Sequence, residues 1–194
     1  MAAERPVKVV ALGDSLMAGY QLPASAAFPA QLEKALKDKG HAVEIANAGV
    51  SGDTSSGGLA RVDWSVPEGT EAVILGLGAN DMLRGIDPEL TRKALTEIIR
   101  KLKARGIEVL LCGMLAAPNF GEDYAKAFNR IYPEIAKAEG VLFDPFFLEG
   151  VAADPKLNLR DGIHPSAAGV TAIAGRILPK AEELLARVRA KRGS

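Results

Sequence analysis

The chain has 194 residues, and its 24 Lys and Arg residues balance 24 Asp and Glu residues, so its formal net charge at pH 7 is zero. This length predicts a single domain over residues 1–194, and the charge balance argues against a nucleic-acid-binding protein, which needs clustered positive charge. The single cysteine, Cys112, excludes an internal disulfide and a cysteine-based zinc site.

Five short apolar segments alternate with longer amphipathic ones along the chain. Each apolar segment is rich in β-branched or other large apolar residues and runs into a turn that contains glycine or proline. Continuous apolar runs of this kind are typical of strands that are buried on both faces of a parallel sheet. The predicted strands are residues 7–12, 43–46, 72–77, 107–112 and 141–143.

The segments between these strands carry a helical pattern. The clearest is residues 87–105, where Asp87 can cap the helix, Pro88 fits its first position and Gly106 ends it. Further helices are predicted at residues 25–39, 122–139 and 166–189, with a kink at Pro179 in the last. Alternating strands and helices predict an α/β fold, a three-layer α/β/α sandwich around a five-stranded parallel sheet.

Polar, glycine-bearing segments follow the predicted strands. In an open parallel sheet, ligands bind beyond the carboxyl ends of the strands, near the point where the strand order reverses. Four segments are expected at that edge or next to it: residues 13–16, 47–53, 78–81 and 161–165. We therefore expect the functional site there.

A serine, a histidine and an aspartate in these segments have the residue types of a catalytic triad. Ser15 lies where the first strand turns sharply, a position that exposes a hydroxyl, although a serine there also fits a helix cap. His164 can take the serine proton, and Asp161 can orient its ring from the same loop. Asp161 and His164 also fit a capping turn or half of a metal site, and the serine at a strand end favours catalysis. The other histidine, His41, is predicted to be an exposed loop residue.

Two further residues fit the stabilisation of a negatively charged intermediate. Acyl transfer needs hydrogen-bond donors aimed at the developing oxyanion. The N–H of Gly49 and the side-chain amide of Asn80 are suitable donors, although each residue alone also fits an ordinary turn. Asp81 is expected to brace its loop.

Together these segments resemble the SGNH subgroup of the GDSL hydrolases, which is named for its Ser, Gly, Asn and His residues. The likeness covers residues 6–185 and is closest to the bacterial thioesterase/lysophospholipase and arylesterase branch. The matching segments are Gly13-Asp14-Ser15-Leu16, Gly49, Gly78-Ala79-Asn80-Asp81 and Asp161-Gly162-Ile163-His164-Pro165.

The resemblance implies a flavodoxin-like fold and a role for each residue. Ser15 is expected to be the nucleophile, His164 the general base and acid, and Asp161 its orienting partner. The expected oxyanion hole consists of the N–H groups of Ser15 and Gly49 and the amide of Asn80. The expected substrate-binding residues are Asp14, Met82, Leu83, Pro118, Phe120 and Ile163.

These observations predict a serine esterase that hydrolyses short- to medium-chain carboxylic esters or thioesters through an acyl-enzyme, without a metal or cofactor. We expect a small-molecule acyl substrate, no nucleic-acid partner, and a monomer or small homo-oligomer. No apolar run reaches the ~18 residues of a membrane span, so no stable membrane anchoring is expected. The resemblance implies a periplasmic or secreted protein, while the lack of an apolar signal-peptide core in residues 1–7 leaves the cytoplasm open.

Three alternatives remain at this point. A carbohydrate O-deacetylase of the same family would keep the mechanism and change the substrate. A metal-dependent phosphoester hydrolase would use oxygen and nitrogen ligands from the same segments; these are Asp14, Asp53, Asp81, Asp161 and His164. A non-catalytic flavodoxin-like binding module would use residues 76–81, which partly match a G-x-G phosphate loop but lack its third glycine and a P-loop lysine.

Overall fold

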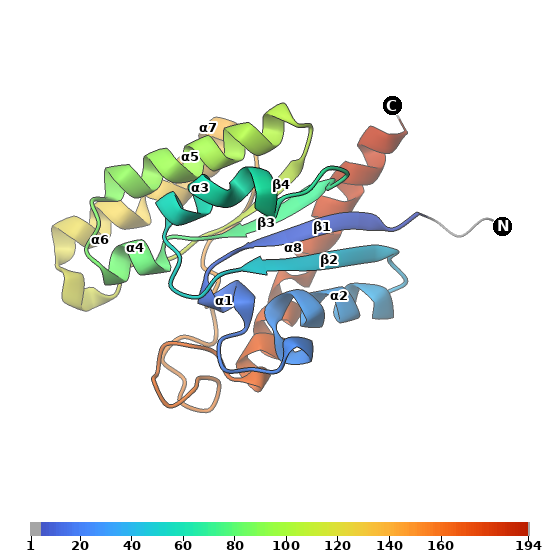
Figure 1. Ribbon diagram of the computed structural model, residues 1–194. Coiled ribbons are helices and arrows are strands. Elements are labelled where there is room, and N and C mark those ends of the chain that lie inside the picture. The colour runs from blue at the N-terminus through green and yellow to red at the C-terminus, as the bar shows by residue number, and fades with distance from the viewer. Residues whose placement is uncertain (1–4, 194) are drawn as a thin grey trace.

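A fully parallel sheet forms the centre of the computed structural model, which describes residues 5–193 (Figure 1). Its five strands lie in the order β2-β1-β3-β4-β5. They are β1 (Val7–Gly13), β2 (Val43–Gly49), β3 (Ala72–Gly76), β4 (Glu108–Cys112) and β5 (Leu142–Asp144). The five predicted strands and the α/β sandwich are confirmed. The prediction that residues 1–7 lack a signal-peptide core falls partly on residues 1–4, which lie outside the described range.

Helices cover both faces of the sheet (Figure 1). One face carries α2 and α8, and the other carries α3, α5 and α7. The helices are α1 (Ser15–Ala18), α2 (Phe28–Asp38), α3 (Ser55–Ser65), α4 (Ala79–Leu83), α5 (Pro88–Ala104), α6 (Glu122–Asn129), α7 (Ile131–Glu139) and α8 (Ala167–Arg192). Two short 3-10 turns, Ala24–Ala26 and Pro118–Phe120, complete the described elements. Within residues 5–193, each helix is too short or too polar to span a membrane.

The apolar strands are buried because successive side chains enter different cores. Val9 and Ala11 of β1 belong to the core under α2 and α8, whereas Val10 and Leu12 belong to the core under α3, α5 and α7. This alternation follows from the pleat of a strand, and with both faces covered it favours apolar residues on both sides of the strand.

Two predicted helices differ from those observed. Helix α2 starts only at Phe28, because residues 24–26 form a 3-10 turn and Pro29 lies in the first helical turn. The segment 122–139 forms two helices rather than one, since Pro133 lacks the N–H that would continue α6 past Arg130. The last predicted helix is observed as α8, with Pro179 inside it. Helix α3 was not predicted, because the adjacent Gly57 and Gly58 are poor helix formers.

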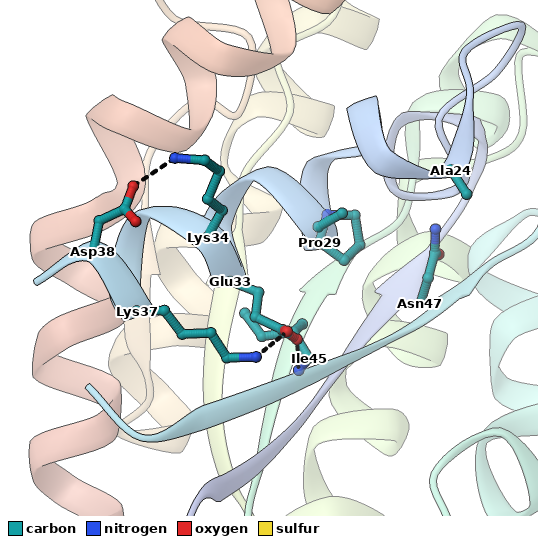
Figure 2. Close-up of a pocket in the computed structure, with 9 residues that line it drawn as sticks. Ala24, Pro29, Glu33, Lys34, Lys37, Asp38, Ile45 and Asn47 are labelled. Atoms are coloured by element: carbon teal, nitrogen blue, oxygen red, sulfur yellow. Dashed lines mark hydrogen bonds and ion pairs between the residues drawn. The ribbon is translucent and has the colours of Figure 1, made fainter. Parts of the chain in front are cut away.

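One edge of the sheet is partly covered by a side chain of α2. β2 is an edge strand, and Glu33 of α2 accepts the N–H of Ile45 at 2.6 Å. Figure 2 shows this contact together with Lys37, which forms an ion pair with the same carboxylate. An unpaired strand edge invites pairing with another chain, so these contacts protect β2 from edge-to-edge association.

Candidate active site

Ser15 stands on a tight turn at the carboxyl end of the central strand β1. The strand ends at Gly13, where an added Cβ would lie 2.5 Å from the carbonyl oxygen of Gly76 and 2.4 Å from Cγ of Met17. Asp14 then caps α1 by accepting the N–H of Leu16 at 3.0 Å. The turn therefore needs glycine at position 13, and it places Ser15 at the edge of the sheet where ligands bind.

Ser15, His164 and Asp161 are joined by a chain of hydrogen bonds. Nε2 of His164 lies 2.9 Å from Oγ of Ser15, and its Nδ1 lies 2.7 Å from Oδ2 of Asp161. The other carboxylate oxygen of Asp161 accepts the backbone N–H groups of His164 and Ile163 at 3.0 and 2.9 Å. These hydrogen bonds, the backbone ones foremost, lower the pKa of Asp161 to about 2. Asp161 is therefore a fixed, ionised acceptor for the imidazole N–H.

The ring of His164 also packs against an aromatic residue. Tyr20, which follows α1, packs on the imidazole with ring centroids 4.3 Å apart and planes tilted by 35°. The backbone around the histidine is closed by a hydrogen bond from Leu159 N–H to the His164 carbonyl at 2.7 Å. Tyr20 was not predicted from the sequence, because nothing in its spacing from Ser15 distinguishes it from an ordinary loop tyrosine.

Asn80 reaches the same site from α4. This helix starts after Gly78, whose φ of +114° is unfavourable for other residues and where a Cβ would lie 2.0 Å from the hydroxyl of Tyr132. The amide of Asn80 donates to the carbonyl oxygen of Asp53 at 2.9 Å, and Asn80 lines the same cavity as Ser15. Asp81 is buried and accepts hydrogen bonds from Ser55 and Thr91, which matches its expected bracing role.

Gly49 lies in a strand and not in the loop where it was expected. It is the last residue of β2, and its N–H donates to the side-chain oxygen of Asn47 at 2.9 Å. An added Cβ on Gly49 would lie 2.2 Å from the backbone N of Ala18, so glycine is required here for close packing of α1 on β2. The Gly49 N–H is thus already engaged in this structure.

Gly52 offers the donor that Gly49 does not. Its φ is +82°, its carbonyl accepts a hydrogen bond from Arg84 at 2.6 Å, and its N–H has no acceptor within residues 5–193. The following residue, Asp53, accepts the amide of Asn80. The unused Gly52 N–H therefore belongs to the turn that Asn80 contacts.

An apolar cavity of about 430 Å³ opens beside these polar groups. Ser15, Asn80 and His164 lie at it, and most of the other lining residues are apolar. Of the expected substrate-binding residues, four line this cavity: Met82, Leu83, Pro118 and Ile163. Asp14 and Phe120 do not line it, since Asp14 is buried beneath the turn and Phe120 packs on Tyr124 with ring centroids 5.7 Å apart.

The proposed metal ligands do not share a centre. Asp53 pairs with Arg61, Asp81 is held by Ser55 and Thr91, and Asp161 binds His164. In the described part of the chain no three or more His, Cys, Asp or Glu side chains are grouped so as to hold a metal ion. The arrangement of these residues therefore gives no support to a metal-dependent phosphoester hydrolase.

The remaining histidine lies away from this site. His41 precedes β2, at the amino end of the sheet, and its Nε2 lies 3.0 Å from a carboxylate oxygen of Glu182 in α8. It lies in a loop, as expected, but its side chain is 23% exposed, so the expectation of an exposed residue is wrong. The contact with α8 covers part of it.

Asp14 is a buried carboxyl group next to the serine, and its titration can be tested. Burial, reinforced by the charges of Asp53 and Asp81, raises the pKa of Asp14 to about 7. A raised pKa in the folded state contributes stability at low pH that is lost as the pH rises through about 7. Asp14→Asn is therefore expected to gain on the order of 2–4 kcal/mol relative to the parent between pH 4.5 and 8. Urea denaturation at both pH values measures this difference.

A second helix-capping aspartate provides the control for this prediction. Asp87 caps α5 by accepting the N–H of Glu89 at 2.9 Å, and it lies on an exposed part of the chain. Asp87→Asn changes the same cap chemistry without a buried charge, so its effect should vary little over the same pH range. An equal pH dependence in the two variants would contradict the raised pKa of Asp14.

Comparison with known proteins gives consistent matches over most of the chain. The sequence model of the GDSL-like Lipase/Acylhydrolase family matches residues 11–172. "Esterase TesA" of Pseudomonas aeruginosa is 39% identical over 91% of this chain and 89% of its own length. "Thioesterase 1/protease 1/lysophospholipase L1" of Escherichia coli is 42% identical over 80% of this chain and 74% of its own. The crystal structure of AlinE4, described as an SGNH-hydrolase family esterase, has a TM-score of 0.80 and 40% identity, covering 95% of this chain and 99% of that one.

Proposed function

Because the chain belongs to the GDSL-like lipase/acylhydrolase family, we propose that it is a serine esterase that hydrolyses carboxylic esters or thioesters through an acyl-enzyme. The observation that carries this proposal is the hydrogen-bonded chain Ser15–His164–Asp161 at the mouth of an apolar cavity. A serine hydroxyl is a poor nucleophile at neutral pH without such a base.

In the proposed reaction, Oγ of Ser15 attacks the carbonyl carbon while Nε2 of His164 takes its proton. The tetrahedral intermediate then breaks its bond to the alcohol or thiol, which leaves with the proton from His164. Water attacks the acyl-enzyme by the same route, with His164 again as base, and releases the carboxylic acid and Ser15. Asp161 keeps the imidazole in the tautomer that can accept the serine proton, and it stabilises the imidazolium.

The oxyanion is stabilised by three donors in this proposal. They are the N–H of Ser15, the amide of Asn80 and the N–H of Gly52, which replaces Gly49. Gly52 is favoured because its N–H is unused within residues 5–193, whereas that of Gly49 is bonded to Asn47. Such donors act strongly because they are in place before charge develops.

The apolar cavity is the proposed acyl site. Its volume of about 430 Å³ and its apolar lining favour an acyl chain over a sugar, which would leave hydroxyl groups without partners. The proposed substrates are therefore short- to medium-chain acyl esters rather than acetylated carbohydrates.

Acyl-chain length tests this assignment. With nitrophenyl esters, kcat/KM is expected to rise about 2- to 4-fold per added CH₂ from acetyl to hexanoyl, because each buried CH₂ contributes up to about 0.8 kcal/mol. Ala116→Leu narrows the lining and should move the optimum to shorter chains, with little change for the acetyl ester. Leu90→Ala removes an exposed apolar side chain of α5 outside the cavity and serves as the control. A chain-length profile unchanged by Ala116→Leu would place the acyl group elsewhere.

The proposed mechanism is tested by selective inhibition. Nitrophenyl butyrate hydrolysis is expected to survive a chelator and to be abolished by an organophosphonate that traps nucleophilic serines. Peptide mass spectrometry should locate the phosphonate on Ser15, because this hydroxyl is hydrogen-bonded to the histidine. Loss of activity to the chelator with survival under the phosphonate would overturn the serine mechanism.

The proposed cellular location rests on the resemblance to the family alone. We propose a periplasmic or secreted protein, monomeric or a small homo-oligomer. Fractionation of cells that express the native gene tests the location, and light scattering of the purified protein tests its oligomeric state.

A further inference from the structure

Arg61 of α3 is a buried arginine at the centre of the loops that surround the site. Its exposure is 7%, and its guanidinium donates to four acceptors in the structure. Nη2 donates to the carbonyl of Gly13 at 2.9 Å, and Nη1 donates to the carbonyl of Ala48 at 2.9 Å and to Oγ of Ser65 at 3.0 Å. Nε donates to the carboxylate of Asp53 at 2.7 Å.

The partners of Arg61 belong to the segments that carry the reacting groups. Gly13 immediately precedes the turn that holds Ser15, and its carbonyl also accepts the N–H of Val50 at 2.9 Å. The N–H of Asp53 donates to the carbonyl of Val50 at 3.1 Å and so closes the turn that starts at Val50. Through these contacts one guanidinium connects the serine turn to the turn that contains Gly52.

The contacts of Arg61 also extend to Asn80, the side-chain donor of the proposed oxyanion hole. The carbonyl of Asp53 accepts the amide of Asn80 at 2.9 Å, so the residue whose carboxylate binds Arg61 also orients Asn80. Gly57 makes room for this carboxylate, because a Cβ at position 57 would lie 1.9 Å from Oδ1 of Asp53. Glycine at position 57 is thus required for this orientation of the Asp53 carboxylate.

The planar guanidinium is well suited to this place. Arginine presents several N–H donors in a rigid fork, whereas lysine offers a compact ammonium on a flexible stem. Here the fork bonds two strand-end carbonyls and one carboxylate in nearly complete isolation from solvent. A buried charge is tolerated only when it is paired and hydrogen-bonded, and Arg61 meets both conditions.

We propose that Arg61 is a positioning residue for ester hydrolysis. It fixes the oxyanion donors Gly52 and Asn80 relative to Ser15, and it acts through Asp53 without touching the substrate. This inference rests on the proposed esterase function and adds a residue to it. A purely structural arginine would stabilise the fold without affecting the transition state of the folded enzyme.

Arg61→Met tests the proposal against a matched arginine. Arg192 makes the same kinds of bond, to the carboxylate of Glu71 and to the carbonyls of Arg5 and Pro6, but at the amino end of β1. Arg192→Met is therefore expected to lower the melting temperature while kcat stays within about twofold. Arg61→Met is expected to lower kcat for nitrophenyl butyrate about 10²- to 10³-fold with KM within about threefold, the size of losing an oxyanion donor.

A transition-state mimic separates positioning from general damage. Butylboronic acid is expected to form a tetrahedral adduct with Ser15, whereas a butyl ether analogue of the ester binds only as the substrate does. In folded Arg61→Met the inhibition constant of the boronic acid should rise at least 30-fold, with that of the ether unchanged. Arg61→Lys should recover less than a tenth of the lost kcat, because one ammonium cannot replace the fork.

Two further results complete the test. If Arg61→Met does not fold, Asp53→Asn provides the second variant, since it removes the charge that Nε binds and leaves the bonds to Gly13 and Ala48. A loss of kcat of at least tenfold in Asp53→Asn supports the proposal. Folded Arg61→Met or Asp53→Asn with kcat within threefold of an active parent overturns it, whereas a parent inactive on every ester would contradict the esterase function instead.

Discussion

Ser15→Ala is expected to lower kcat for nitrophenyl butyrate by about 10⁶-fold, to the rate supported by binding and the oxyanion donors alone. The reason is the loss of the only atom that forms the acyl-enzyme in the proposed reaction. The Oγ of Ser15 has His164 as its hydrogen-bond partner and faces the cavity, so removing it leaves the core packing intact. The melting temperature should therefore change by no more than a few degrees. Discontinuous assays at a high concentration of the variant measure the residual rate.

The matched control for this variant is Ser25→Ala. Ser25 lies in the 3-10 turn Ala24–Ala26, on an exposed part of the chain, and its loss should leave kcat unchanged. Phosphonate labelling should disappear in Ser15→Ala and persist in Ser25→Ala. Residual activity above one percent of the parent in a preparation of Ser15→Ala free of wild-type protein would show that another group is the nucleophile.

The sheet was predictable because its strands are buried on both faces. Burial makes every residue of a strand such as Val73 to Leu75 apolar, and that run is visible without knowledge of the fold. Helix α3 was not predictable in the same way, since its two adjacent glycines serve local packing and hide its helical pattern. Gly57 accommodates Asp53, and a Cβ on Gly58 would lie 2.3 Å from Leu77.

The site was predictable as far as it follows the strand ends. Ser15 and Asn80 come within four residues of the ends of β1 and β3, and Pro165 places His164 in a loop, so their residue types and positions indicated their chemistry. The glycine donor was assigned to Gly49 because the second strand was expected to end at residue 46. β2 continues to Gly49, which makes that residue part of the strand, and the loop with the unused N–H starts only beyond it.

Arg61 and Tyr20 could not be recognised in the sequence. An arginine on a short helix usually lies at the surface, and only the tertiary structure places its guanidinium between two strand ends and Asp53. Tyr20 contacts His164, which is 144 positions away in the chain. Contacts between residues so far apart leave no local pattern, and they are the part of a site that sequence periodicity cannot supply.

Asp161→Asn is expected to lower kcat about 10⁴-fold while the protein stays folded. The carboxylate has two acceptor oxygens, one for Nδ1–H of His164 and one for the N–H groups of Ile163 and His164. An asparagine has one acceptor oxygen and one NH₂ group. The backbone N–H groups cannot turn away, so they should take the oxygen and leave the NH₂ group facing Nδ1.

That orientation favours the wrong tautomer of the histidine. An NH₂ group opposite Nδ1 makes this nitrogen the acceptor, which leaves the proton on Nε2, and Nε2 can then no longer take the proton of Ser15. Asp154→Asn is the matched control, because Asp154 accepts the N–H of Lys156 at 2.9 Å in a nearby turn without touching the histidine. Kinetics of both variants with nitrophenyl butyrate test the difference. A reduction of less than tenfold in Asp161→Asn would mean that His164 is oriented by other groups, with Tyr20 the first to test.

The low pKa of Asp161 fixes how this prediction depends on pH. A carboxylate whose pKa falls from 3.8 to about 2 on folding contributes stability above about pH 4, and this contribution is lost as the pH falls through about 2. Asp161 is therefore ionised throughout pH 5–9. Protonation of Asp161 should not lower the ratio of parent activity to Asp161→Asn activity in this pH range. A decrease of that ratio between pH 7 and 5 that follows protonation of a single carboxyl group would contradict the fixed ionised state. Because its own loop donates to the carboxylate through two N–H groups, Asp161 stays charged even where its side chain meets solvent.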